Sequence, residues 1–128
     1  MEVSCDLKGV DFEWFAVDRN GRLALFVTAG DGFVPASVAA AADAISTLSS
    51  TISTPHVGTG HVWEDYGNVG LYVYDWAMPV GPYGLIQSPL QALSPGFRQA
   101  ILGLPALPKF DVEFGVTELV GMVDCVAA

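Results

Sequence analysis

The stretch Asp11-Phe12-Glu13-Trp14-Phe15-Ala16-Val17-Asp18-Arg19-Asn20-Gly21 decides the fold, together with the apolar segment that follows it to Thr28. Segments 12–17 and 22–28 are rich in aromatic and branched residues, and the Asn20-Gly21 pair between them is typical of a tight β-hairpin turn. Both faces of each segment are largely apolar, so we expect two central strands with other elements packed on each side. The stretch therefore predicts an antiparallel start to the fold.

The residues after the hairpin predict a helix. Gly30-Asp31-Gly32 ends the second strand. Apolar residues then recur at spacings of three and four from Val38 to Ile52, which is the pattern of a helix with one apolar stripe. Pro35 suits the start of this helix, and Pro55 ends it.

A second hairpin, a second helix and a last strand follow. Segments 61–66 and 69–76 predict the hairpin, which turns at Gly67-Asn68. Ser94-Pro95 is typical of a helix start, because serine caps a helix and proline suits its first turn. The apolar–polar alternation of residues 110–117 predicts a half-buried strand.

Length and composition agree with one folded unit. The chain has 128 residues, of which 52% are hydrophobic and 15% charged, so it can bury a core of its own. We therefore expect a single α+β domain over residues 1–128, in which a mostly antiparallel sheet is built from hairpins and accompanied by two helices.

The chain is strongly acidic. It carries 14 Asp and Glu residues against 5 Lys and Arg residues, which gives a formal net charge of −9. The negative field disfavours nucleic acid and anionic membranes as partners and favours a basic protein. Plain solubility is the alternative interpretation, since many cytoplasmic bacterial proteins are acidic.

The sequence predicts a cytoplasmic protein with reduced thiols. The first six residues lack the basic start and apolar core of a signal peptide, and no stretch approaches the ~18 apolar residues of a membrane helix. Cys5 and Cys125 lie near opposite ends of the chain, and in a cytoplasmic protein we expect both to be free.

Chemistry-bearing residues are few. His56, His61, Glu64 and Asp65 form the one cluster that resembles a metal site, but their spacing matches no known ligand signature. A Gly-x-Ser-x-Gly elbow is absent from the sequence. We expect no catalytic residue, no metal and no cofactor. The alternative is a small-ligand or metal-binding module, or an enzyme, that uses the His56–Asp65 region.

Acidic and aromatic residues are interleaved on the predicted second hairpin, where carboxylates lie next to Trp63, Tyr74 and Trp76. Aromatic rings supply buried contact area in protein interfaces, and carboxylates pair with Arg or Lys and steer association. In the alternative interpretation the rings belong to the core and the carboxylates to an ordinary solvated rim. The candidate partner-binding residues are Asp31, Glu64, Asp65, Tyr66 and Asp75.

Two stretches of the chain resemble one family of small bacterial proteins. The first stretch is Asp11-Phe12-Glu13-Trp14-Phe15-Ala16-Val17-Asp18 with Gly21, Phe26, Gly30 and Pro35. The second runs from Tyr74-Asp75-Trp76 and Gly81-Pro82-Tyr83 through Leu93, Phe97-Arg98 and Leu104-Pro105 to Phe110. The family is that of proteins that look like immunity proteins of polymorphic toxin systems.

The resemblance implies a non-enzymatic protein that binds a cognate antibacterial toxin stoichiometrically and blocks it. The closer resemblance is to the immunity partner of a DNase effector delivered by type VI secretion. Because a nuclease carries a basic DNA-binding groove, a protein of charge −9 would be drawn to it. The shared motifs are a hairpin, turns and helix starts, so the resemblance transfers no binding residue. A structural subunit that forms a homo-oligomer is a further alternative.

Overall fold

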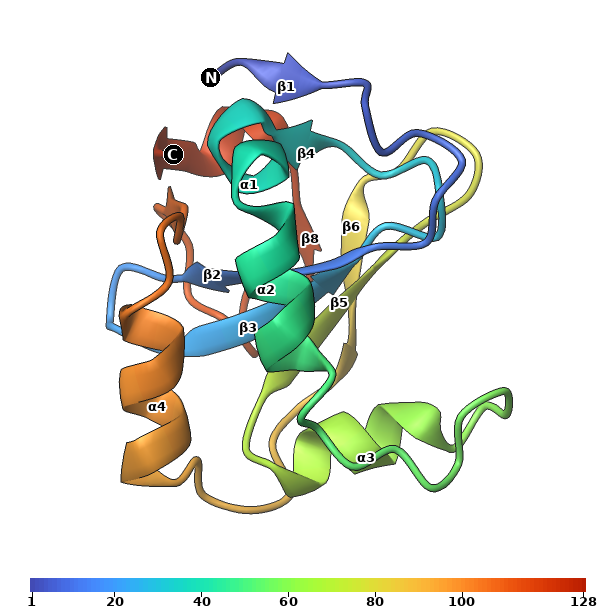
Figure 1. The fold of residues 1–128 in the computed structure, drawn as a ribbon, viewed down its shortest axis with the longest axis vertical. Helices are drawn as coiled ribbons and strands as arrows, with labels where there is room; N and C mark the ends of the chain where they lie inside the picture. The colour runs from blue at the N-terminus through green and yellow to red at the C-terminus, as the bar shows by residue number, and fades with distance from the viewer.

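The computed structural model describes residues 1–128 and contains both helices and strands, which confirms the α+β class (Figure 1). The strands are β1 (Val3–Ser4), β2 (Glu13–Val17), β3 (Leu23–Val27), β4 (Val34–Pro35), β5 (Tyr72–Trp76), β6 (Tyr83–Gln87), β7 (Lys109–Phe110), β8 (Leu119–Val120) and β9 (Cys125–Ala127). The helices are α1 (Ala36–Ala40), α2 (Ala42–Ser49), α3 (Val62–Asn68) and α4 (Pro95–Leu102), with a 3-10 helix, η1 (Met122–Asp124). None of the helices has the length and apolar character needed to cross a membrane.

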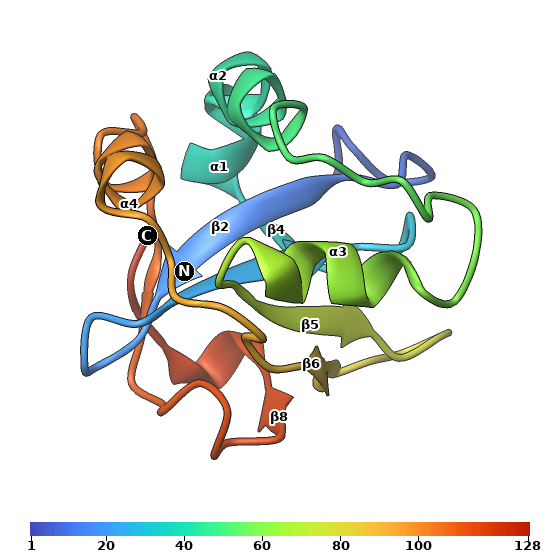
Figure 2. The ribbon, with the colours of Figure 1, turned by 90° about the horizontal axis from the view of Figure 1, so that it is seen from below.

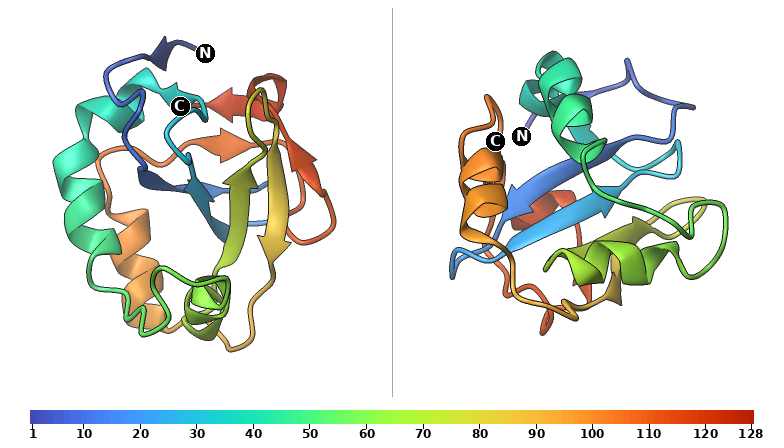
Figure 3. Two further views of the ribbon diagram at one scale, coloured as in Figure 1. Left: turned by 90° about the vertical axis from the view of Figure 1, so that its right-hand side faces the viewer. Right: turned by 60° about the horizontal axis from the view of Figure 1, so that its bottom comes forward.

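A seven-stranded sheet in the order β8-β6-β5-β3-β2-β7-β9 forms the centre of the fold. Most neighbours are antiparallel, as expected, but β3–β5 and β2–β7 are parallel pairs. The sheet is strongly curled (Figure 3). Figure 2 shows α2 and α4 beside β2, while β6 and β8 lie on the opposite side of the molecule. Strands β1 and β4 pair separately.

The first hairpin is confirmed, and β2 and β3 are its strands. Gly21 adopts a φ of +81° in the turn, a conformation that glycine reaches without strain. The buried Asp18 carboxylate accepts hydrogen bonds from the backbone N–H groups of Asn20, Arg22 and Phe114, each at 2.8 Å. One carboxylate therefore closes the turn and ties it to a loop far away in the sequence.

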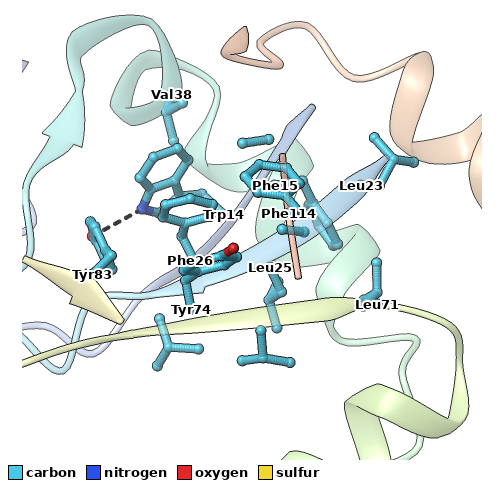
Figure 4. Packing of buried hydrophobic residues seen from close by; sticks show 14 of the residues in the cluster. Trp14, Phe15, Leu23, Leu25, Phe26, Val38, Leu71, Tyr74, Tyr83 and Phe114 are labelled. Atoms are coloured by element: carbon cyan, nitrogen blue, oxygen red, sulfur yellow. Dashed lines mark hydrogen bonds between the residues drawn. The ribbon is translucent and has the colours of Figure 1, made fainter. Parts of the chain in front are cut away.

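The inner face of the curled sheet is aromatic. Trp14, Phe26 and Tyr74 are register partners on adjacent strands, and their rings stack with centroids 4.7 Å and 5.2 Å apart (Figure 4). The Trp14 indole N–H donates to the Tyr83 hydroxyl at 3.3 Å, and this hydroxyl donates to the Phe33 carbonyl at 2.8 Å. The buried polar atoms of the Trp14 and Tyr83 rings thus have hydrogen-bond partners, as buried polar groups generally do.

Helices cover the other face of the sheet. Phe15, Leu25 and Val73 are register partners on that face, and the Phe15 ring meets Phe97 of α4 edge-on at 6.3 Å. Helix α2 packs on β2, and α3 packs on β5 and β6. Figure 3 shows α2 and α4 together on one side of the strands.

The predicted long helix is present as two short helices that meet at Ala41. The φ angle of Ala41 is −106°, which interrupts the regular helix between α1 and α2. The apolar stripe is correct, since Val38, Ile45 and Ile52 are all buried. The start of the second predicted helix is confirmed: the Ser94 side chain caps α4 by accepting from the Phe97 N–H.

The predicted second hairpin is wrong in its first half. Residues 62–68 form α3, and only residues 72–76 form a strand, β5. The reason is topological: β5 lies parallel to β3, and a parallel pair needs a long crossover, which here contains α1, α2 and α3. The structure therefore has four α-helices where two were expected.

The predicted last strand is correct in burial only over residues 110–114, since Val116, the next apolar position of the alternation, is 67% exposed, and it is wrong in hydrogen bonding. Phe110, Val112 and Phe114 are buried while Asp111 points to solvent, as the alternation indicated. Only Lys109–Phe110 pairs as a strand, because the following backbone turns at Gly115, whose φ is +89°.

Candidate functional site

Four of the five Lys and Arg residues gather at one end of the central strands, near the β2–β3 turn, which lies on the left of Figure 1. Arg19 forms an ion pair with Asp111 at 3.3 Å, and Arg22 forms one with Glu113 at 3.3 Å. The four cations of this basic end are Arg19, Arg22, Arg98 and Lys109, where Arg98 reaches the turn glycine and Lys109 pairs with the last residue of β2. The carboxylates of Asp111 and Glu113 are therefore already engaged in ion pairs within the protein.

Carboxylates gather at the opposite end, where β2 begins and β3 and β5 finish. In the register, Glu13 lies opposite Val27, which lies beside Asp75, so the two acidic side chains project from the same face of the sheet. The residues of this acidic end are Asp11, Glu13, Asp31, Glu64, Asp65 and Asp75. None of them forms an ion pair with Lys or Arg.

Glu13 is the most unusual carboxylate of the acidic end. Its Oε2 atom exposes less than 1 Å² and has no hydrogen-bond partner. Burial raises the pKa of Glu13; the Tyr66 hydroxyl opposes this rise, and the nearby Asp11 charge adds to it. Burial also raises the pKa of Asp75, with a further contribution from Asp11. The Asp11 charge thus repels both the Glu13 and the Asp75 carboxylate in a partly dehydrated place.

A cavity of about 260 Å³ opens between α3 and the start of β2. We call it the α3 pocket, and its lining residues are Asp11, Glu13, Val27, Val57, Gly58, Val62, Trp63 and Tyr66. The ring centroids of Trp63 and Tyr66, both on α3, lie 6.4 Å apart. Burial and the Glu13 carboxylate together raise the pKa of the Tyr66 hydroxyl, which therefore stays protonated beside it.

Asp65 holds the loop that forms the rim of the α3 pocket. Its buried carboxylate accepts from the His56 backbone N–H at 2.9 Å and contacts the His56 Nδ1 at 2.8 Å. Burial alone would raise the pKa of Asp65, but these hydrogen bonds outweigh it, so the net pKa is lowered. The same hydrogen bond raises the pKa of His56. Asp65 is thereby occupied within the protein and positions Val57 and Gly58.

Metal-binding geometry is not present: no group of three or more His, Cys, Asp and Glu side chains converges on one point. His61 contacts the exposed Glu64 at 3.0 Å. The Thr59 hydroxyl donates to the His56 carbonyl rather than to its ring. Both cysteines are free. The chemistry that this end of the molecule offers is therefore carboxylate oxygens and aromatic faces, which suit a cation.

The five predicted partner-binding residues all lie at the acidic end, but in two different settings. Asp31 and Glu64 are exposed and Asp75 is half-buried. Asp65 and Tyr66 are buried on α3. The expected acidic and aromatic residues do not lie on one hairpin, because residues 62–68 form α3, and Tyr74 is a core residue whose hydroxyl donates to the Thr117 carbonyl at 2.6 Å.

Sequence reasoning missed Asp11 and Glu13 as site residues. The available signal was Glu13 itself, a charged residue inside an otherwise apolar central strand, where charges are rare unless paired.

No family model, no curated protein and no solved structure matches this chain.

Proposed function

We propose that this chain is an immunity protein that binds a basic toxin through its acidic end and neutralises it without catalysis. The observation that supports the proposal is the segregation of charge: carboxylates without Lys or Arg ion-pair partners gather at one end of the sheet, and four of the five Lys and Arg residues gather at the other, the exception being Lys8, which lies near Asp31. The class of toxin that this surface suits is a nuclease, and the compartment is the cytoplasm, where a DNase effector of type VI secretion would act.

Electrostatics explains why such a surface is useful to an inhibitor. A nuclease binds DNA through Lys and Arg side chains that neutralise phosphates. A cluster of carboxylates presents a comparable negative charge to the same groove and so competes with DNA for it. Charge complementarity also raises association rates, by about 10- to 1,000-fold at low salt. Rapid capture suits a protein that must block a toxin before it acts.

The test is co-purification of this chain with the product of the neighbouring gene, followed by a DNA-cleavage assay with and without it. The proposal expects a tight complex and silenced cleavage. Absence of a complex, or unchanged cleavage within one, would refute it.

A matched pair of triple variants locates the interface. Asp31→Asn, Glu64→Gln and Asp75→Asn together remove three charges from the acidic end. Because complementary charges raise the association rate, we expect this variant to associate about 10-fold more slowly and with a weaker salt dependence.

The control removes three charges elsewhere: Glu2→Gln, Asp43→Asn and Glu118→Gln, all at exposed positions. Equal slowing in both triple variants would mean that net charge, and not the acidic end, drives association. Asp65 is left intact because it holds the pocket rim.

One observation favours the alternative function in the His56–Asp65 region. A buried carboxylate orients an exposed imidazole at 2.8 Å, an arrangement that also occurs beside metals and in acid–base sites. Zinc that stays with the purified protein through desalting, and is lost when both histidines are replaced by Asn, would support this alternative. Metal-free protein that still neutralises the toxin would exclude it.

A further inference from the structure

We propose that the α3 pocket binds the guanidinium group of a single arginine side chain. The inference deepens the proposed function, on which it rests for the source of that arginine, a surface of the toxin. The residues that carry it are Asp11, Glu13, Trp63 and Tyr66, which all line the pocket.

The size of the cavity selects the kind of ligand. About 260 Å³ is below the range of about 300–1,000 Å³ typical of pockets for drug-sized molecules. A single side chain fits this space better than a nucleotide or an organic cofactor does. The walls Val27, Val57 and Val62 are apolar, so the ligand needs an aliphatic stem as well as a polar head.

The charge of the pocket selects a cation. Asp11 and Glu13 both line it, and no Lys or Arg of this chain neutralises either. The Glu13 Oε2 atom is hidden from water and forms no hydrogen bond of regular geometry, and the neighbouring Tyr66 hydroxyl is a neutral donor that leaves the carboxylate charge uncompensated. Asp11 uses its Oδ1 to accept from the Ala29 N–H at 3.1 Å, and no hydrogen bond engages its Oδ2. A cation in the pocket would offset the charge on both carboxylates.

The aromatic wall favours arginine over lysine. Trp63 and Tyr66 both line the pocket, with ring centroids 6.4 Å apart and ring planes inclined by 39°, and a planar guanidinium stacks on the face of one such ring while it donates to carboxylates in its plane. A lysine ammonium is more strongly hydrated, so its transfer into a pocket with three valine walls is less favourable.

The test uses N-acetyl-arginine methylamide as the probe and the tryptophan indole N–H signals in NMR spectra as the readout. The chain has three tryptophans, and Trp14 is fully buried, so its signal is an internal reference. We expect the Trp63 signal to shift with a dissociation constant of the order of millimolar, which corresponds to one side-chain contact. The neutral isostere N-acetyl-citrulline methylamide should bind at least 10-fold more weakly, and the lysine analogue about 3-fold more weakly.

Variants assign the contact. Glu13→Gln and Asp11→Asn should each weaken arginine binding at least 5-fold. Glu118→Gln is the matched control, because it removes the same charge from an exposed position outside the acidic end and should change binding less than 2-fold. Thermal melts of all three variants check that they are folded.

Three outcomes would overturn the proposal: a Trp63 signal that does not move, equal shifts with citrulline, or equal weakening by Glu13→Gln and Glu118→Gln. The two proposals fail separately. If the toxin is neutralised but the arginine probe does not bind, only the assignment of the pocket is wrong. If the probe binds but the toxin is not neutralised, only the function is wrong.

Discussion

Replacement of Glu13 by Gln should stabilise the protein at neutral pH. The carboxylate lies in a central strand with one oxygen hidden and without a hydrogen bond of regular geometry, close to the charge of Asp11. Hydrogen bonds to charged groups contribute about 1.5–3 kcal/mol, so a hidden carboxylate oxygen without a donor forgoes energy of that order. Because Glu13 is half-buried, we expect the neutral amide to recover about 1–2 kcal/mol of unfolding free energy.

This gain in unfolding free energy corresponds to a rise in the melting temperature. Unfolding entropy is about 2.1 cal/mol/K per residue, so for 128 residues the expected rise is about 4–7 °C at pH 7. The assay is thermal unfolding followed by circular dichroism in 150 mM salt. Glu118→Gln is the control. It removes one negative charge, as Glu13→Gln does, but at an exposed position, and it should change the unfolding free energy by less than about 0.5 kcal/mol.

The pH dependence follows from the direction of the pKa shift. Folding raises the pKa of Glu13 above its ordinary value of 4.5, so the native state holds the proton more tightly than the unfolded state does. The wild-type protein therefore loses stability as pH rises from about 4 through the native pKa, and the Gln variant does not. The advantage of the variant should be complete at pH 7 and vanish below about pH 4. A lower melting temperature in Glu13→Gln, an equal rise in the control, or a gain that persists at pH 4 would refute the reasoning.

Three further results are expected. Asp18→Ala should lower the unfolding free energy in urea by about 3 kcal/mol, because it leaves three backbone N–H donors unpaired; a loss below 1 kcal/mol would contradict this account. Tyr83→Phe should lower it by about 1–3 kcal/mol, because the hydroxyl serves both the Trp14 indole and a backbone carbonyl; an unchanged urea midpoint would argue against these bonds. The pKa of His56 is raised by its hydrogen-bonded carboxylate, so the pairing should stabilise the pocket rim fully below about pH 6.5 and weaken as pH rises through the native pKa. Hydrogen exchange of residues 56–61 should show this loss in the wild type and not in His56→Asn; identical pH profiles would exclude the pairing.

The sequence predicts the parts of this fold that are specified locally. The first hairpin depends on two adjacent apolar segments and an Asn-Gly turn, and α4 on its Ser-Pro start, so both are visible in short windows. The partner of β5 is β3, some 45 residues away in the sequence, and no local pattern identifies a partner so distant. Alternation reports which side chains are buried over residues 110–114 and fails at Val116, which lies beyond the turn at Gly115, and burial does not require a ladder of hydrogen bonds.

The candidate site was predictable in composition and not in geometry. Acidic residues around Glu64 and Asp75 are evident in the sequence, and the structure brings them to one end. Asp65 looks like its neighbour Glu64 but is buried against His56, since its position on a helix turns it inward. The α3 pocket joins the start of β2 to a helix some fifty residues later, and only the three-dimensional packing places them side by side.

The segregation of charge along β2 and β3 makes the molecule an electric dipole. In the field of a basic partner such a dipole experiences a torque, which turns the acidic end forward before the two surfaces touch. Orientational search is what reduces typical association rates from the diffusion limit to about 10⁵–10⁷ M⁻¹s⁻¹. A molecule that arrives already turned avoids part of that search. The torque fades beyond the Debye length of about 8 Å at physiological salt, so it acts only in the last steps of approach.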